Sequence, residues 1–534
     1  MIKVVRIRLP LDYTENDLKR LAAMMLKTDE TDIESCVLTR RKTINKDKND
    51  VHFEGTVNVK LSDKLIDKDV IIHSKCKNAS LAEDNTYCVP KIKTEKRPVV
   101  IGFGPAGIFA SLVLAEAGAA PIVLERGYDI ARRSNDVSIF HGGGKLNTSS
   151  NIQFGEGGAG AFSDGKLKTG YVDARKFKIL TEFVLAGADE SILYLEKAHI
   201  GSDRLHTAVK NLREKIISLG AHVRFGCRLT KIIKKNGRIC AVGYECGSEY
   251  NEIETDNVIL AIGHSARDTI EYLYSEGIQM QQKNFAVGVR IEHPQSLINK
   301  LQYGKSAGHP ALGSADYKLV THLKNGRSVY TFCMCPGGYV VAAASEENGI
   351  CTNGMSEFAR DSQNANTAML VSITPADFGS DHPLAGIEYQ RTIEHSGFIS
   401  GGGNYFAPVQ RLEDFINNTK TTRLGDVRPT YTPGTVSAPL SDYLPRYITD
   451  SLKQGLLDMF DWMPGYYYAD ALLTGPETRT TSPVRLSRTE ALEAVGTNGL
   501  YPCGEGAGYA GGIISAAVDG MLCAEKIIQK YTGI

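Results

Sequence analysis

The clearest pattern of apolar and polar positions lies between residues 97 and 127. Val99–Ile101 and Ile122–Leu124 are short, continuous apolar runs, which are typical of buried parallel strands. The long apolar segment between them predicts a helix that ends at Gly118. The pattern therefore predicts strand, turn, helix and strand, the repeating unit of an α/β fold.

The turn of this unit has the spacing GxGxxG, formed by Gly102, Gly104 and Gly107. In a dinucleotide-binding turn, the first glycine permits the tight turn and the second lets a pyrophosphate approach the backbone. The third lets the helix pack close to the strand. Glu125 follows the second strand, where a carboxylate can accept hydrogen bonds from an adenosine ribose. A lone GxGxxG is weak evidence, but this context favours a nucleotide site over a βαβ unit without a ligand.

A second series of elements predicts the rest of the same domain. Leu205–Leu219 has an apolar stripe at helical spacing, and Ala221–Phe225 follows it as a strand. Thr230–Lys235 and Arg238–Tyr244 are separated by Asn-Gly, which predicts a hairpin. Val258–Ile262 has the pattern of another buried strand.

The composition changes along the chain predict four parts. We expect an N-terminal α+β domain at residues 1–90, with a ferredoxin-like fold as the candidate. The nucleotide-binding domain would occupy residues 97–282 and return at 481–534, with a substrate domain at 283–480 inserted between them. The charged segment Arg41–Asn49 is interpreted as a solvated loop. A nucleic-acid patch is the weaker alternative there, because aromatic side chains for base stacking are missing.

Charge and composition narrow the possible partners. Lys plus Arg and Asp plus Glu both total 61, so no global field draws the chain to nucleic acid or to an anionic membrane. The start of the chain lacks the apolar core of a signal peptide, and no run approaches the ~18 apolar residues of a membrane span. The eleven cysteines show no framework, so we expect reduced thiols, no metal site and a cytoplasmic protein. A small-molecule substrate is the expected partner, and the sequence does not indicate an oligomeric state.

Two further segments of the chain are rich in glycine. Near the C-terminus, a strand ends at Gly504-Glu505, and a glycine-rich turn opens a helix at Ile513. The other segment, Asn151–Gly160, also contains a GxGGxG spacing but lacks the strand before it and the acid-terminated strand after it. We interpret it as a loop that wraps a cofactor, with backbone amides such as those of Gly157 and Gly158 facing phosphate or flavin. A plain ordered loop is the alternative.

Together the three segments resemble the FAD-dependent oxidoreductases of the glutathione-reductase-like fold, and in particular the family of uncharacterised FAD-dependent dehydrogenases. The segments that carry the resemblance are Ser150–Leu167, Ile259–Asp268, Phe285–Gln295, Cys333–Val341, Asn353–Ser356, Thr478–Arg485 and Gly504–Ile513. It implies FAD as the cofactor, with NAD(P)H as a candidate transient co-substrate. It also implies a Rossmann FAD domain with an inserted mixed-sheet substrate domain and a small N-terminal α+β domain.

Carried onto this sequence, the resemblance implies a set of cofactor-binding residues. Those expected along the pyrophosphate are Gly102, Gly104, Pro105, Ala106, Gly107, Gly263 and His264. Those expected at the adenosine are Glu125, Arg126, Arg228 and Leu229, and those expected at the ribityl chain and the ring are Gly504, Glu505, Gly512 and Ile513. The helix that begins at Ile513 would aim its N-terminus at the flavin N1–C2=O edge, where its dipole favours negative charge.

The candidates for catalysis are Lys166, Arg290, His309, Cys333 and Cys335. Residues two apart on a strand share a face, so Cys333 and Cys335 are a candidate redox pair, with simple packing as the alternative. Arg290 either binds an anionic substrate or pairs with an acid. His309 is either an acid–base group or a structural histidine. The resemblance implies that Lys166, with Ser163, contacts flavin N5 or the substrate.

These observations predict an FAD-dependent oxidoreductase that transfers a hydride between flavin N5 and an unidentified substrate or NAD(P)H. Only one fingerprint has the full strand–turn–helix–acid context, so no separate NAD(P) domain is expected. The alternatives are a flavin-dependent monooxygenase, an FAD-dependent RNA-modifying enzyme and a non-catalytic module of the same fold. The neutral charge disfavours the RNA enzyme, and the intact glycine motifs disfavour the non-catalytic module.

Overall fold

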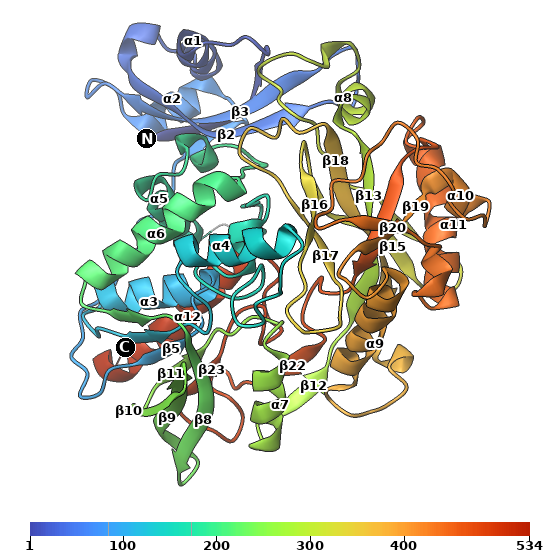
Figure 1. Ribbon diagram of the computed structural model, residues 1–534. Helices are drawn as coiled ribbons and strands as arrows, with labels where there is room; N and C mark the ends of the chain where they lie inside the picture. Colours follow the sequence, from blue (N-terminus) through green and yellow to red (C-terminus); the bar gives the residue numbers. More distant parts are fainter. Residues whose placement is uncertain (84, 172, 534) are drawn as a thin grey trace.

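The computed structural model describes residues 1–83, 85–171 and 173–533, and sheets of four, five and seven strands form its framework (Figure 1). The predicted α/β class is confirmed, with a Rossmann-type sheet, a mixed-sheet insertion and a small N-terminal α+β unit. The domain boundaries at residues 90, 97, 282 and 480 stay a prediction. No helix among the described residues combines the length and the apolar character needed to cross a membrane.

The five-stranded sheet is parallel and has the order β23-β11-β5-β6-β7. Its strands are β5 (Val99–Ile101), β6 (Ile122–Leu124), β7 (His222–Arg224), β11 (Val258–Leu260) and β23 (Leu500–Pro502). The predicted β5–turn–helix–β6 unit is confirmed. Its helix, α3 (Pro105–Glu116), is apolar on every side because it lies between the sheet and α12 (Ile513–Thr532).

The strands of this sheet alternate between two cores. Val100 and Ile259 face the layer of α3, α12 and α6 (Ser202–Ser218), whereas Val99 and Leu260 face a three-stranded antiparallel meander. The meander consists of β8 (Cys227–Lys235), β9 (Arg238–Cys246) and β10 (Glu249–Glu254), and its first two strands are the predicted hairpin. Helix, parallel sheet and meander therefore form three layers, which fits the continuous apolar runs of these strands.

The meander also corrects the expectation that every cysteine is a free thiol. Cys227 and Cys246 lie opposite each other in the antiparallel pairing of β8 and β9, with their Cα atoms 4.3 Å apart, and they form a disulfide. Cysteine counts along the sequence could not reveal this pairing, because the register of the two strands creates it.

The inserted part is built on a seven-stranded mixed sheet of order β14-β15-β18-β13-β21-β19-β20. Its strands are β13 (Phe285–Pro294), β14 (Val320–His322), β15 (Ser328–Cys335), β18 (Asn364–Ile373), β19 (Ala407–Arg411), β20 (Thr435–Ser437) and β21 (Leu472–Glu477). Val289 and Ile291 of β13 pack into the core beneath α11 (Arg446–Trp462), while Arg290 points to the opposite face. Helix α9 (Ala385–Ser400) packs against β19 and β21.

The N-terminal unit is an antiparallel sheet of order β2-β3-β1-β4 with two helices. Its elements are β1 (Ile2–Leu9), α1 (Glu15–Leu26), β2 (Ile33–Ile44), β3 (His52–Leu61), α2 (Asp67–Ser74) and β4 (Ala79–Leu81), an order that the ferredoxin-like unit shares. The segment 41–49 is not the solvated loop that we expected. Its first part continues β2 to Ile44, and the Asn45 and Lys48 side chains bond to Gln302.

Shorter elements connect these units. They are α4 (Ile130–His141), α5 (Ala174–Leu185), α7 (Arg267–Ser275), α8 (Gln295–Tyr303), α10 (Leu412–Ile416), β12 (Met280–Gln282), β16 (Tyr339–Ala342), β17 (Thr352–Met355) and β22 (Val484–Leu486). β12 pairs with β22, which lies about 200 residues further along the chain, whereas β16 pairs with the nearby β17.

Candidate functional site

A cavity of about 500 Å³ lies where the parallel sheet meets the mixed sheet. Loops at the carboxyl ends of β5, β6, β11 and β23 line one side of it. Residues of β15 and β17, and the segment after β21, line the other side. The carboxyl ends of parallel strands are the usual place for a ligand in an open α/β sheet, so this cavity is the candidate site.

The glycines of the first turn are required for two different reasons. Gly102 has a φ of 97°, and a Cβ atom at Gly102 or at Gly107 would collide with a backbone carbonyl. At Gly104, by contrast, the nearest atom to an added Cβ would be the Cα of Gly158, at 3.5 Å. Protein packing therefore requires Gly102 and Gly107, whereas Gly104 leaves room beside the cavity that a pyrophosphate can use. The residues of this turn fit FAD.

Glu125 lines the cavity as predicted, but its carboxylate already has backbone partners. It accepts hydrogen bonds from the N–H groups of Phe103 at 2.7 Å, Gly127 at 2.8 Å and Gly155 at 2.9 Å. A carboxylate has about four lone-pair sites, so one acceptor site is left for a ribose hydroxyl. The ribose contact stays a prediction, and the three amide bonds are a role that the sequence did not indicate.

Arg126 and Arg228, expected at the adenosine, lie at the same end of the cavity. The Arg126 guanidinium lies over the Phe154 ring, 4.4 Å from its centroid. Asp268, which we did not predict, joins the two arginines, with oxygens 2.8 Å from Arg126 and 3.3 Å from Arg228. Leu229, Pro105 and Ala106, the other predicted residues of this half, also line the cavity.

At the other end, the predicted C-terminal residues meet the loop after β11. Glu505 lies 3.2 Å from Nδ1 of His264, and both residues line the cavity with Gly263 and Gly504. Helix α12 has no side-chain cap at its N-terminus, and a Cβ atom added at Gly512 would meet no other atom within 4 Å. Gly512 and Ile513 line the cavity, so this helix N-terminus is available for an acceptor group.

The third glycine segment differs from its expected role. The N–H of Gly157 donates to the carbonyl of Phe103, and that of Gly158 donates to Gly155, each at 2.9 Å. These two amides are thus not free to face a phosphate. Gly158 still lines the cavity, whereas Gly157 packs against Ala161 and Val209 outside its lining.

The five catalytic candidates are not brought together. Lys166, Cys333 and Cys335 line the cavity, but Arg290 and His309 do not. His309 lies 3.2 Å from Asp12 of the N-terminal unit. Arg290 follows the second of its two predicted alternatives, because it is fully buried and pairs with Glu477, at 3.0 Å for the Nη2–Oε1 contact.

Cys333 and Cys335 both line the cavity, but the strand between them is irregular, so their spacing does not support the predicted shared face, and the redox pair stays a prediction. The pairing of β15 with β18 shifts register between Phe332 and Cys335, and Cys333 has a φ of 43°. The bulge leaves the Cys333 side chain exposed in the cavity and buries that of Cys335. Protein atoms around the cavity keep most water away from the Cys333 thiol, and this desolvation raises the pKa of Cys333 to about 12, so the group is a protonated thiol at neutral pH.

Lys166 belongs to an ionic cluster that sequence reasoning missed. Its Nζ lies 2.9 Å from Asp164 and also donates to the carbonyl of Met334, while Arg360 binds Asp164 through two nitrogens. Burial alone would lower the pKa of Lys166, but Asp164 raises it, so the amine stays protonated. Burial alone would raise the pKa of Asp164, but Lys166 and Arg360 hold it well below its usual range. The signal available in the sequence was the position of Asp164, two residues before Lys166.

This cluster predicts a specific pH dependence of stability. The Asp164→Asn change keeps the shape of the side chain and removes its charge. The folded-state pKa of Asp164 is depressed below the unfolded value of about 3.9. Its contribution is therefore complete above about pH 4 and is lost as the pH falls below that value. We expect the wild-type free energy of unfolding, measured in urea from about pH 5 to 3, to fall more steeply than that of Asp164→Asn. Parallel curves would contradict this assignment.

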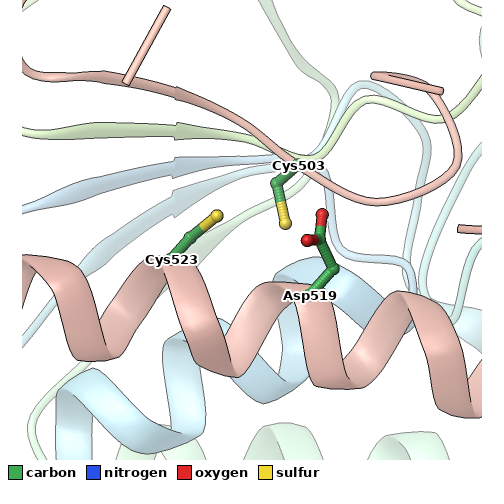
Figure 2. Close-up of side chains that lie close together, drawn as sticks. All are labelled: Cys503, Asp519 and Cys523. Carbon is green, nitrogen blue, oxygen red and sulfur yellow. The ribbon is translucent and has the colours of Figure 1, made fainter. Parts of the chain in front are cut away.

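Cys503, Asp519 and Cys523 form a buried group behind the C-terminal turn, between the end of β23 and helix α12 (Figure 2). Their donor atoms are those of a metal site, but Arg488 binds both oxygens of Asp519, at 2.8 and 3.0 Å. The N–H of Gly504 donates to the same carboxylate at 2.7 Å. A hydrogen bond with Cys523, together with burial, raises the pKa of Cys503. The group therefore fixes the Gly504 turn against α12.

Comparison with known proteins agrees with this geometry. Residues 284–480 match the model of the family described as "FAD-dependent protein, C-terminal domain-like". An uncharacterised protein of Clostridium beijerinckii is 46% identical over 99% of both chains.

Two solved structures show weaker likeness. A flavoprotein/dehydrogenase from Cytophaga hutchinsonii is 13% identical, with 82% of this chain and 79% of the other covered and a TM-score of 0.36. A flavin-dependent brominase is 12% identical, with 82% of this chain and 81% of the brominase chain covered and a TM-score of 0.38. Likeness at this level does not bear on activity.

Proposed function

Since this chain belongs to a family of FAD-dependent proteins, we propose that it is an oxidoreductase acting on a small-molecule substrate, with NAD(P)H as a candidate electron donor. When bound, FAD supplies a ring position that accepts or returns a hydride. The observation that carries the proposal is the two-sided cavity, with nucleotide-binding turns on one side and a polar face of the mixed sheet on the other.

The chain's own residues would perform four tasks. The turn at Gly102–Gly107 would bind the pyrophosphate, and the Glu505–His264 pair would orient the ribityl chain. The N-terminus of α12 would stabilise negative charge at the nearby edge of the ring. On the opposite side, Lys166 and the thiol of Cys333 would hold the substrate in the cavity, away from bulk water.

The second candidate is a monooxygenase, because a cavity beside the ring would serve that reaction as well. A monooxygenase differs from a dehydrogenase in that its reduced form transfers an oxygen atom to the substrate, and a search for oxygenated product distinguishes the two activities.

The first test is the cofactor and its reduction. We expect the purified protein to be yellow and to release FAD rather than FMN on denaturation. Anaerobic stopped-flow mixing with NADH, NADPH and then a panel of metabolites should bleach the flavin absorbance with one of them. A protein that takes up no flavin after refolding with excess FAD would contradict the proposal.

A further inference from the structure

The half of the cavity that faces the mixed sheet is rich in cationic side chains. Five lie in one region of the lining: Lys166, Lys168, Lys197, Lys318 and Arg360. The acids among them are Asp164 and Asp316. Glu477 also lines this half, but Arg290 neutralises it. These side chains therefore leave an excess of positive charge, although the whole chain is neutral.

We propose that the site takes an anionic substrate, one that carries a carboxylate or a phosphate group, through a basic entrance formed by Lys168, Lys197 and Lys318 and ending at Lys166. This inference rests on the proposed function, because it names the class of molecule that would meet FAD in the cavity.

The outer lysines lie at the opening, since each of them lines the cavity and is exposed to solvent. Within the described chain, Lys168 and Lys318 have no acidic partner, whereas Lys197 pairs with Asp316 at 2.5 Å. The N-terminal unit positions this edge, because Arg40 pairs with Glu196 at 2.7 Å and Arg41 donates its N–H to Tyr194 at 2.6 Å.

At the inner end of the basic entrance, the positive charge of Lys166 and Arg360 is only partly neutralised. Lys166 and Arg360 share the single carboxylate of Asp164, so one unit of positive charge is left between them. An ammonium has three N–H donors, and Lys166 uses two of them, for Asp164 and for the carbonyl of Met334. The third donor has no protein partner among the described residues and is available to an anionic group of the substrate.

The remaining charges of this half do not oppose an anion. Arg479 is paired with the buried Glu394 at 2.8 Å, and Glu477 is paired with Arg290. A cleft lined by one sign of charge raises the local concentration of the opposite ion, and the effect falls with ionic strength. The entrance should therefore speed the arrival of anions and slow that of cations.

The test uses the FAD-loaded protein, photoreduced without oxygen and mixed with one of two one-electron oxidants. Ferricyanide is the anionic probe and hexaammineruthenium(III) the cationic probe, with two equivalents accepting the two electrons of the reduced cofactor. Stopped-flow absorbance gives the second-order rate constant at each salt concentration. We expect the ferricyanide constant to fall about tenfold between low and high salt, and the ruthenium constant to rise.

A pair of double variants tests whether the lysines at the entrance cause the salt dependence. Lys168→Gln/Lys318→Gln should lower the ferricyanide constant at low salt and flatten its salt dependence. Lys68→Gln/Lys77→Gln removes the same charge from exposed lysines of the N-terminal unit that do not line the cavity, and should behave as the wild type. Equal behaviour of the two double variants would overturn the basic entrance.

The inner site is tested with inorganic phosphate and acetate as competitors at constant ionic strength. Saturable slowing of the ferricyanide reaction by one of them, absent in Lys166→Gln, identifies the phosphate or the carboxylate class. If neither competes better than chloride, no anion is held at Lys166 and the inference is wrong. A preparation that binds no FAD would instead remove the proposed function, so the two failures are distinguishable.

Discussion

The Gly104→Val variant should fold but lose FAD. The atoms nearest to a Cβ at this position are the Cα of Gly158, at 3.5 Å, and its backbone nitrogen, at 3.9 Å, so the apoprotein can accommodate the first carbon of the new side chain. The γ-methyl groups extend further, into space that a pyrophosphate needs beside the turn. We expect the Kd for FAD to rise at least ~100-fold, which corresponds to about 2.7 kcal/mol.

Fluorescence titration of the apoprotein with FAD measures this loss. Circular dichroism and thermal melting of the apoprotein should match the wild type, which separates lost binding from lost folding. Gly170→Val is a matched control, because a Cβ there meets no atom within 4 Å and the residue does not line the cavity. A Gly104→Val protein with wild-type affinity would place the pyrophosphate elsewhere.

The Arg290→Met variant should lose a large part of its stability. All five N–H groups of this buried guanidinium have partners: both oxygens of Glu477, the side-chain oxygens of Asn353 and Asn366, and the carbonyl of Cys333. Methionine fills much of the volume but leaves the Glu477 carboxylate buried without its counter-charge. Breaking one side of a buried ion pair costs about 3–5 kcal/mol.

Urea unfolding followed by circular dichroism gives the free energy of unfolding of this variant. The double variant Arg290→Met/Glu477→Leu removes both charges and should recover much of the loss, since an apolar pair carries no desolvation cost. Arg8→Met breaks the exposed pair with Asp50 and should change little. A single variant as stable as the wild type would mean that the Glu477 carboxyl is already protonated in the native protein.

The local parts of the fold could be predicted from the sequence, because local patterns determine them. The strand at Val99–Ile101, the glycine turn and the helix that begins at Ile513 were found from apolar runs and glycine spacing. The partners of Arg290 could not be found in this way, since Glu477 lies 187 residues further along the chain. Only the pairing of β13 with β21 brings the two together.

The predictions that the structure corrects failed for the same reason. The spacing of Cys333 and Cys335 predicts a shared face only on a regular strand, and the bulge in β15 is set by its pairing with β18. Likewise, glycine spacing indicates that the Gly157–Gly158 backbone is unusual, but not that its amides donate to Phe103 and Gly155. Each case depends on which distant segment lies beside the residue.

The three hydrogen bonds of Glu125 have a consequence for the order of assembly. They tie the turn after β5, the end of β6 and the loop at Gly155 to a single carboxylate through protein atoms alone. The entropy of ordering these segments is thus lost during folding rather than at the moment of binding, which raises affinity by preorganisation. FAD would then bind to a site that is already ordered, after the chain has folded, and the apoprotein would be a stable folded intermediate in the maturation of the protein.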